Sequence, residues 1–187
     1  MRELQNKYRN EGKGTTMAGK SKAPTFSGPV VLGIHSNVVG GDHSMRSGHA
    51  WITVKEGDKT VYFGLWPDGH PRTVDNKEKT DVRVGLEAGR KAAASRFYRL
   101  GKARTQRLNS FLQKRRGWSV TYNCSSWASH LFYQVVGVDV DADDWFSVET
   151  PRELGSSIRE LENNKKSTTR GSPTSPGEEQ ASSSLTG

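Results

Sequence analysis

Cys124 is the only cysteine in the 187-residue chain, and it stands where a thiol could act as a nucleophile. It follows a short β-type run at residues 118–122 and opens a helical pattern over residues 124–136. Asn123, directly in front of it, is a typical helix N-cap. The positive end of a helix dipole favours the thiolate, and the amides of a first helical turn can stabilise an oxyanion. A lone cysteine is more often an inert core residue, so a catalytic role also requires a base.

The base is sought among five histidines. His49 follows a glycine and directly precedes the β-rich residues 50–54, so a rigid strand can aim its imidazole. We therefore predict that Cys124 is the nucleophile and His49 its general base. A surface or structural role is assigned to the histidines at three other positions: His35, His43 and His130.

A third side chain should hold the imidazole in the productive tautomer. The β-rich residues 50–66 are interrupted by a Glu-Gly-Asp-Lys turn, which predicts an antiparallel hairpin. The register of that hairpin places His49 opposite Trp66, with Asp68 and His70 just beyond. We favour Asp68 as the orienting residue and keep His70 as the alternative, because an aspartate in a turn after proline is also common.

Other segments predict the elements that must position these side chains. Residues 29–34 form a short apolar run typical of a buried strand, and residues 95–100 are a further candidate strand. Residues 105–116 have apolar positions at helical spacing and predict an amphipathic helix ended by Gly117. The Thr-Pro-Arg-Glu sequence within residues 150–154 is a capping box that begins another helix. Strands in mixed order with a few helices predict the α+β class.

Both ends of the chain are polar. Residues 1–27 are basic and show no apolar periodicity, and residues 163–187 are mostly Ser, Thr, Pro, Gly, Lys and Glu. Neither end can bury enough apolar surface to offset the entropy of ordering it. We therefore expect a flexible basic N-terminal segment, one folded domain at residues 28–162 and a disordered tail.

Charge and hydropathy exclude some classes of protein. No apolar stretch is long enough to cross a bilayer, and no hydrophobic block follows the N-terminal cations, so we expect no standard secretory signal. The net charge of +8 suits an anionic partner such as a bacterial wall. The basic residues 105–116 contain a single aromatic, Phe111, and we interpret them as a solvated face rather than a specific nucleic-acid site.

Metal and phosphate sites are poorly supported. Four residues could be assembled into a zinc site on paper: His35, His43, His49 and Cys124. They contain no close-spaced ligand pair of the kind that zinc sites use. Residues 39–42 are glycine-rich but lack the Lys-Ser/Thr of a phosphate loop. We expect neither a metal nor an organic cofactor.

Three segments resemble circularly permuted papain-like hydrolases, relatives of the NlpC-type cell-wall amidases and of lecithin:retinol acyltransferase. They read GHAWI at residues 48–52, YFGLWPDG at 62–69 and YNCSSWA at 122–128. In that group the histidine strand precedes the cysteine helix, as it does here. The resemblance spans residues 29–161 and implies an antiparallel sheet packed against a helix with the catalytic cysteine at its N-terminus. The second strand has no histidine at its middle, which counts against the lipid acyltransferases.

Carried onto this chain, the resemblance makes Cys124 the nucleophile and His49 the base. Residues 151–154, after the acidic residues 139–144, also resemble bacterial toxins delivered by type VI secretion. This implies an antibacterial cysteine amidase or peptidase that cleaves a peptide amide of peptidoglycan. Such a toxin would be made in a bacterial cytoplasm, exported without a signal peptide and active in the target-cell periplasm, with an immunity protein and the secretion apparatus as partners.

Two alternatives to a wall amidase are kept. The same thiol chemistry could serve a protease or deamidase that acts on a protein of the target cell. In a different class, the chain could be a non-catalytic basic binding module. The Cys124–His49 pair argues against the binding module, because a protein that only binds has no need of both residues.

Overall fold

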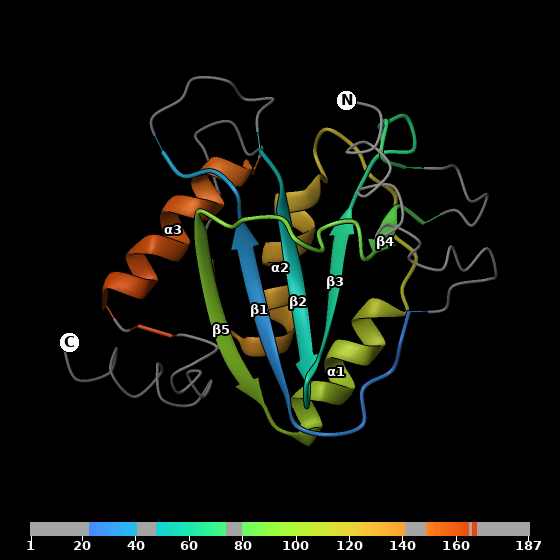
Figure 1. Cartoon of the computed structure of the whole chain (residues 1–187), viewed down its shortest axis with the longest axis vertical. Helices are drawn as coiled ribbons and strands as arrows, with labels where there is room; N and C mark the ends of the chain where they lie inside the picture. The colour runs from blue at the N-terminus through green and yellow to red at the C-terminus, as the bar shows by residue number, and fades with distance from the viewer. Residues whose placement is uncertain (1–22, 41–47, 74–79, 141–148, 165, 168–187) are drawn as a thin grey trace, which may run out of the picture.

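The computed structural model describes residues 23–40, 48–73, 80–140, 149–164 and 166–167 (Figure 1). Within these residues the chain is α+β, with one five-stranded antiparallel sheet and three helices. The strands are β1 (Val30–Ser36), β2 (Ala50–Glu56), β3 (Lys59–Leu65), β4 (Val82–Val84) and β5 (Ala94–Leu100), in the spatial order β4-β3-β2-β1-β5. The helices are α1 (Lys102–Leu112), α2 (Cys124–Val136) and α3 (Pro151–Asn164).

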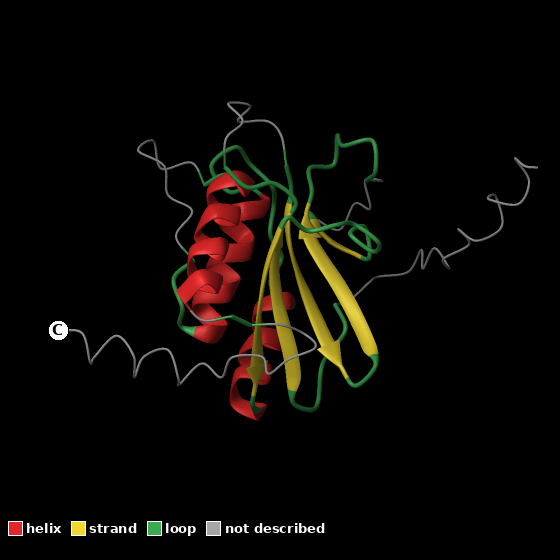
Figure 2. Cartoon of the chain, turned by 60° about the vertical axis from the view of Figure 1, so that its left-hand side comes forward, coloured by secondary structure: helices red, strands yellow, loops and turns green. Residues whose placement is uncertain are grey.

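The helices pack on one face of the sheet, as Figure 2 shows. Alternate strand residues such as Leu32, Ile52 and Phe63 point to that face and are fully buried in the core. Helix residues that include Trp127 and Leu131 complete this core. Burial of this apolar surface is the main stabilising contribution to the fold.

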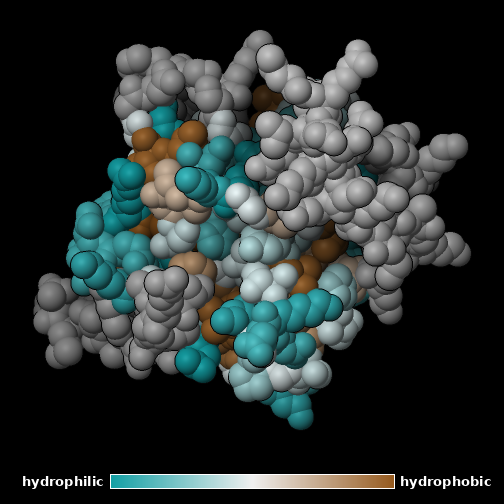
Figure 3. Space-filling model, viewed as in Figure 1, coloured by the Kyte–Doolittle hydropathy of each residue, from teal (hydrophilic) through white to brown (hydrophobic). Residues whose placement is uncertain are grey.

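The other face of the sheet carries polar and aromatic side chains. Trp51 and His35 lie directly opposite each other on β2 and β1, and both are buried outside the main core cluster. Because β4 and β5 are opposite edges of the sheet, residues 85–93 must cross it, and Figure 1 shows them passing over this face. In the space-filling view of Figure 3, hydrophobic residues form separate areas on this side rather than one continuous patch.

Four predicted strands are confirmed with small shifts at their ends: those at 29–34, 50–54, 60–66 and 95–100. The hairpin register is also as predicted, since Ile52 pairs with Phe63 and the turn falls at Gly57, which has a φ of 57°. The sequence analysis did not predict β4, which has three residues and pairs only with the end of β3.

The strand predicted at residues 118–122 is wrong. Ser119 and Tyr122 instead close a tight turn through reciprocal backbone hydrogen bonds of 3.0 and 3.3 Å. Asp81 holds the start of this turn through two hydrogen bonds. Its carboxylate accepts from the Trp118 amide, and its backbone amide donates to the Arg116 carbonyl. These hydrogen bonds of Asp81 hold residues 116–118 beside the start of β4, and none of the described strands pairs with residues 118–122.

The helix predicted at residues 105–116 is confirmed in type but begins earlier, at Lys102, and ends at Leu112. Leu112 is the last apolar residue that this helix buries. Residues 113–116 are Gln, Lys, Arg and Arg, so no further apolar side chain continues the buried face of the helix beyond this point.

Both ends of α2 and the start of α3 are as predicted. The Asn123 side chain accepts from the amides of Ser125 and Ser126 at 2.8 and 3.3 Å, and Gly137 ends α2 in the left-handed region with a φ of 83°. Thr150 and Glu153 form the predicted capping box of α3.

The expected domain boundary at residues 27 and 28 lies within the described chain. Phe26 is buried in the core, and the amides of Ser27 and Gly28 donate to the Glu56 carboxylate at 2.9 and 2.8 Å. The tail predicted to be disordered from residue 163 begins later than expected, because α3 continues to Asn164 and Ser167 is buried and bonded to Glu162. Residues 1–22 and 168–187 of the predicted flexible ends lie outside the described residues. None of the described helices is both long and apolar enough to span a membrane.

Candidate active site

The fold brings Cys124 and His49 into contact. Cys124 is the first residue of α2, which packs behind the sheet, and His49 immediately precedes β2. The thiol and the imidazole are hydrogen-bonded, and the thiol also receives a backbone hydrogen bond from Ala50. Both side chains are buried, with exposed fractions of 8% for Cys124 and 5% for His49. The two residues that the sequence analysis paired therefore form one site.

Glu87 holds the other side of the imidazole. His49 Nε2 lies 2.9 Å from Glu87 Oε1, and both side chains are buried at this contact. Because Glu87 occupies Nε2, the nitrogen left for the Cys124 thiol is Nδ1. The indole N–H of Trp66 donates to the same Glu87 oxygen and fixes the carboxylate from a second direction. The arrangement is a thiol, an imidazole and a buried carboxylate in series, the order used by nucleophilic triads.

Glu87 reaches the imidazole because β3 has a glycine at position 64. Phe63 and Leu65 point to the core, so position 64 faces the opposite side of the sheet. A Cβ built on Gly64 would lie 1.9 Å from Glu87 Oε1 and 2.9 Å from His49 Nε2. Only a residue without a side chain leaves space for the carboxylate at this point.

A compact turn between β4 and β5 positions Glu87. The amide of Ala88 donates to the Gly85 carbonyl at 3.1 Å, and the amide of Arg90 donates to the Glu87 carbonyl at 2.9 Å. Gly85 and Gly89 have φ values of 88° and 79°, in the region that favours glycine. These bonds hold the Glu87 side chain inward over the sheet.

The electrostatics favour a thiolate–imidazolium pair. Burial alone would raise the pKa of the Cys124 thiol, but the hydrogen bond and charge of His49 outweigh it and lower that pKa below the ordinary value. Burial alone would likewise lower the pKa of His49, but Cys124 and Glu87 outweigh it and raise that pKa. Each shift favours the charged form, as in a thiol activated by a neighbouring histidine.

Two tryptophans restrict the imidazole. The ring of Trp66 is centred 4.0 Å from that of His49, and the Trp51 ring is stacked nearly parallel to it at 6.1 Å. Both indoles are buried. They limit rotation of the imidazole and keep water away from its hydrogen bond to Glu87.

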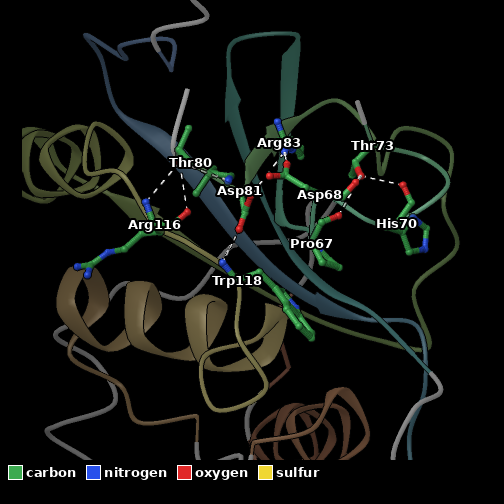
Figure 4. A network of polar contacts seen from close by, with 10 residues as sticks. Pro67, Asp68, His70, Thr73, Thr80, Asp81, Arg83, Arg116 and Trp118 are labelled. Carbon is green, nitrogen blue, oxygen red and sulfur yellow. Dashed lines mark hydrogen bonds and ion pairs between the residues drawn. The ribbon is translucent and has the colours of Figure 1, made fainter. Parts of the chain in front are cut away.

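The structure corrects the predicted orienting residue. Asp68 forms an ion pair with Arg83, and its side chain is half exposed (Figure 4). His70 contacts the edge of Trp66, with ring centroids 4.5 Å apart, and neither residue makes a hydrogen bond to His49 among the contacts described. Both follow β3 as expected, but the turn after Pro67 directs the Asp68 carboxylate to Arg83 and places His70 against Trp66 instead of in a hydrogen bond to His49.

The N-terminus of α2 offers fewer free amides than we expected. Asn123 already occupies the amides of Ser125 and Ser126. The Cys124 amide makes no hydrogen bond with any described residue, so it is the first-turn donor left for an oxyanion. The Asn123 cap therefore stabilises the start of the helix and reduces the number of amides that can donate to an oxyanion.

Sequence reasoning missed Glu87 because it sought the third residue on the strand after His49. The available signal is the Gly85-Leu86-Glu87-Ala88-Gly89 stretch, a carboxylate between two glycines. Glycine pairs of this kind mark tight turns but do not indicate which side chain points inward. Only the crossing of residues 85–93 over the sheet brings Glu87 to His49.

The other histidines serve elsewhere. His35 is held by Ser95 and Thr53, each at 2.8 Å, and burial lowers its pKa to about 3. His130 packs on α2 against Tyr122 and Phe111, and His43 lies outside the described residues. No three His, Cys, Asp or Glu side chains in the described part of the chain are grouped so as to hold a metal ion.

Comparisons of the chain with known protein families, with curated proteins and with solved structures found no match.

Proposed function

We propose that this protein is a cysteine hydrolase in which Cys124 is the nucleophile, His49 the general base and Glu87 the orienting carboxylate. The hydrogen-bonded series Cys124–His49–Glu87 is the observation that carries this proposal. A core cysteine that only fills space has no need of an imidazole with a raised pKa or of a buried carboxylate behind it. The cost of burying that carboxylate is easier to explain by function than by packing.

The proposed mechanism is acyl transfer through a thioester. His49 takes the thiol proton, and the Cys124 sulfur attacks the amide carbonyl carbon. The Cys124 amide stabilises the oxyanion, and His49 gives its proton to the leaving nitrogen as the C–N bond breaks. Water then attacks the thioester while His49 takes its proton. The C–S bond breaks, the acid is released, and the thiol is restored.

A permuted papain-like fold of the NlpC type belongs to the same proposal. It is supported by the order of the elements, with the histidine strand before a helix that carries the cysteine at its N-terminus. It is also supported by the packing of that helix on an antiparallel sheet. The GHAWI and YNCSSWA segments that carry the resemblance are the ones that meet at the site.

The substrate proposed for this chemistry is a peptide amide of peptidoglycan, hydrolysed by a secreted antibacterial toxin that acts in the target-cell periplasm. Its support is the resemblance to type VI amidase effectors. The net charge of +8 suits a protein drawn to an anionic wall. The main alternative is a protease or deamidase that uses the same catalytic residues to cleave an amide bond in a protein of the target cell.

The catalytic pair is tested first, with a thiol reagent. Iodoacetamide should alkylate Cys124 rapidly at neutral pH, and His49→Ala should slow the reaction strongly, as followed by intact mass. Since Cys124 is the only cysteine, every adduct reports this thiol. Slow labelling that is indifferent to His49 would contradict the enzyme and favour a binding module.

The substrate is tested by digestion of purified peptidoglycan with the wild type and with Cys124→Ala, with the fragments identified by mass spectrometry. Fragments that appear only with the wild type would establish a wall amidase and identify the bond. Intact peptidoglycan, together with rapid His49-dependent alkylation, would reject this substrate and direct the search to protein amides.

A further inference from the structure

The indole of Trp66 separates His49 from a group of basic side chains. One contact of the ring is with His49, at 4.0 Å between centroids. The guanidinium carbon of Arg90 lies 5.4 Å from the centroid of the same indole, and His70 meets its edge. Arg72 follows two residues after His70, and its amide donates to His70 Nδ1 at 3.1 Å. One rim of the site is therefore basic, and we call Arg72 and Arg90 the cationic rim.

The cationic rim has no counter-charge in the described part of the chain. Of the described carboxylates close to it in the sequence, Asp68 pairs with Arg83 and Glu87 with His49. Neither Arg72 nor Arg90 makes an ion pair with a described residue. Arg72 is exposed and Arg90 is partly exposed, so their charges are available to a ligand.

The rim is built into the same turns that form the site. Arg90 ends the turn that carries Glu87, and its amide donates to the Glu87 carbonyl at 2.9 Å. The loop that carries Arg72 is closed by Thr73, whose hydroxyl donates to the carbonyls of Pro67 and His70 at 2.9 and 2.7 Å (Figure 4). The backbone at both cations is therefore held by hydrogen bonds within these two turns.

The pKa of His70 responds to the charges around it. Burial lowers its pKa first, and the charges of Arg72, His49 and Arg90 lower it further. His70 is thus neutral near pH 7, and the rim's charge comes from the arginines. The same shift shows that the charges of both guanidinium groups act on His70, at the edge of the Trp66 ring.

We propose that the cationic rim binds a carboxylate of the substrate, so that the enzyme acts on an amide with a free carboxylate close to the scissile bond, as in an acidic peptide. A guanidinium that rests on an aromatic ring keeps its planar fork of donors free, and that fork matches a carboxylate in a bidentate way. The inference rests on the proposed function and deepens it, because it names the substrate class of the same site.

The plainer interpretation is that Arg90 only packs on Trp66. The experiment that separates the two uses reagents of different charge on the same thiol. Iodoacetate is an anion and iodoacetamide is its neutral counterpart, and both transfer a two-carbon group to the sulfur as iodide leaves. The ratio of their rates with Cys124 therefore measures the local potential, whatever the intrinsic reactivity of the thiol.

The ratio is compared among the wild type and the variants Arg90→Gln, Arg72→Gln and Arg90→Lys at low ionic strength. Arg99→Gln is the matched control, since Arg99 is exposed on β5 at the opposite end of the sheet from His49. We expect Arg90→Gln to lower the iodoacetate-to-iodoacetamide ratio by roughly twofold, because Arg90 contacts Trp66 rather than the thiol and a charge about 10 Å away acts at about this strength in water. Arg90→Lys should retain most of the ratio, and Arg99→Gln should leave it at the wild-type value.

The two possible failures give different results. An unchanged ratio in both Arg90→Gln and Arg72→Gln, with rapid His49-dependent alkylation by iodoacetamide, would overturn the cationic rim and leave the hydrolase standing. A ratio that falls equally in Arg99→Gln would also overturn it, because the effect would then be one of net charge. Slow alkylation by both reagents, indifferent to His49, would overturn the hydrolase and this inference together.

Discussion

The Oε1 atom of Glu87 lies where a side chain at position 64 would have to begin, since a Cβ built on Gly64 would stand 1.9 Å from it. The two residues belong to different parts of the sheet, Gly64 to β3 and Glu87 to the segment that crosses from one edge to the other. Their close approach lets the carboxylate lie flat against β3 and face His49 Nε2. Position 64 is therefore a positioning residue for the site, although it has no side chain.

Gly64→Ala should displace the Glu87 carboxylate and loosen His49. We expect iodoacetamide alkylation of Cys124 to slow and the free energy of unfolding to fall by about 1–3 kcal/mol, a typical cost of overpacking. Gly69→Ala is the matched control, because a Cβ at Gly69 would meet nothing within 4 Å. Equal alkylation rates in the two variants would show that the approach of Glu87 to β3 does not matter for reactivity.

Glu87→Gln should keep the shape of the site and remove its charge. The His49 imidazolium would lose a stabilising partner, so the pKa of His49 should fall. We expect alkylation and any hydrolysis to slow by at least about tenfold, the scale of a general-base contribution. Asp68→Asn tests the orienting residue that the sequence analysis favoured, and it should change reactivity little because Asp68 pairs with Arg83. If Asp68→Asn slowed alkylation more than Glu87→Gln, Asp68 would be the orienting residue.

The pH dependence of alkylation should reveal the ion pair. The pKa of Cys124 is lowered and that of His49 is raised, so each shift favours the charged pair. As the pH falls, reactivity should persist below 9.0, the ordinary pKa of a thiol, and be lost only when Cys124 takes up a proton. In His49→Ala the hydrogen bond and charge of His49 are lost while burial remains, so the midpoint of Cys124 should move to higher pH. Rates of iodoacetamide adduct formation across the pH range measure both midpoints.

Asn123→Ala should destabilise the start of α2. The side-chain oxygen of Asn123 caps two amides, and its Nδ2 donates to the Glu149 carbonyl at 2.7 Å. We expect a loss of about 1 kcal/mol in the free energy of unfolding from the missing cap. Asn123→Asp keeps the acceptor but lacks the Nδ2 donor, so it separates capping from the link to Glu149. Thermal or urea unfolding of both variants would measure each contribution, and equal losses would mean that capping is not what Asn123 contributes.

The local sequence was enough to predict α2, its caps and the pairing of His49 with Cys124. Asn123 and Gly137 mark the helix by their own backbone preferences, and those preferences act over a few residues. The β2–β3 hairpin follows in the same way, because one short turn sets its register and brings Trp66 to His49. The α+β class is a consequence of these separate patterns.

Only the tertiary structure decided which carboxylate faces the imidazole. Asp68 lies close to the hairpin in sequence, but its own turn directs it to Arg83. Glu87 is distant from both Cys124 and His49 along the chain, and it reaches them only because the segment after β4 must cross the sheet to β5. Local propensity carries no information about such a crossing, since the crossing depends on the order of strands in the finished sheet. The proposed nucleophile and base could therefore be predicted from the sequence, whereas the carboxylate that contacts the imidazole depended on the fold.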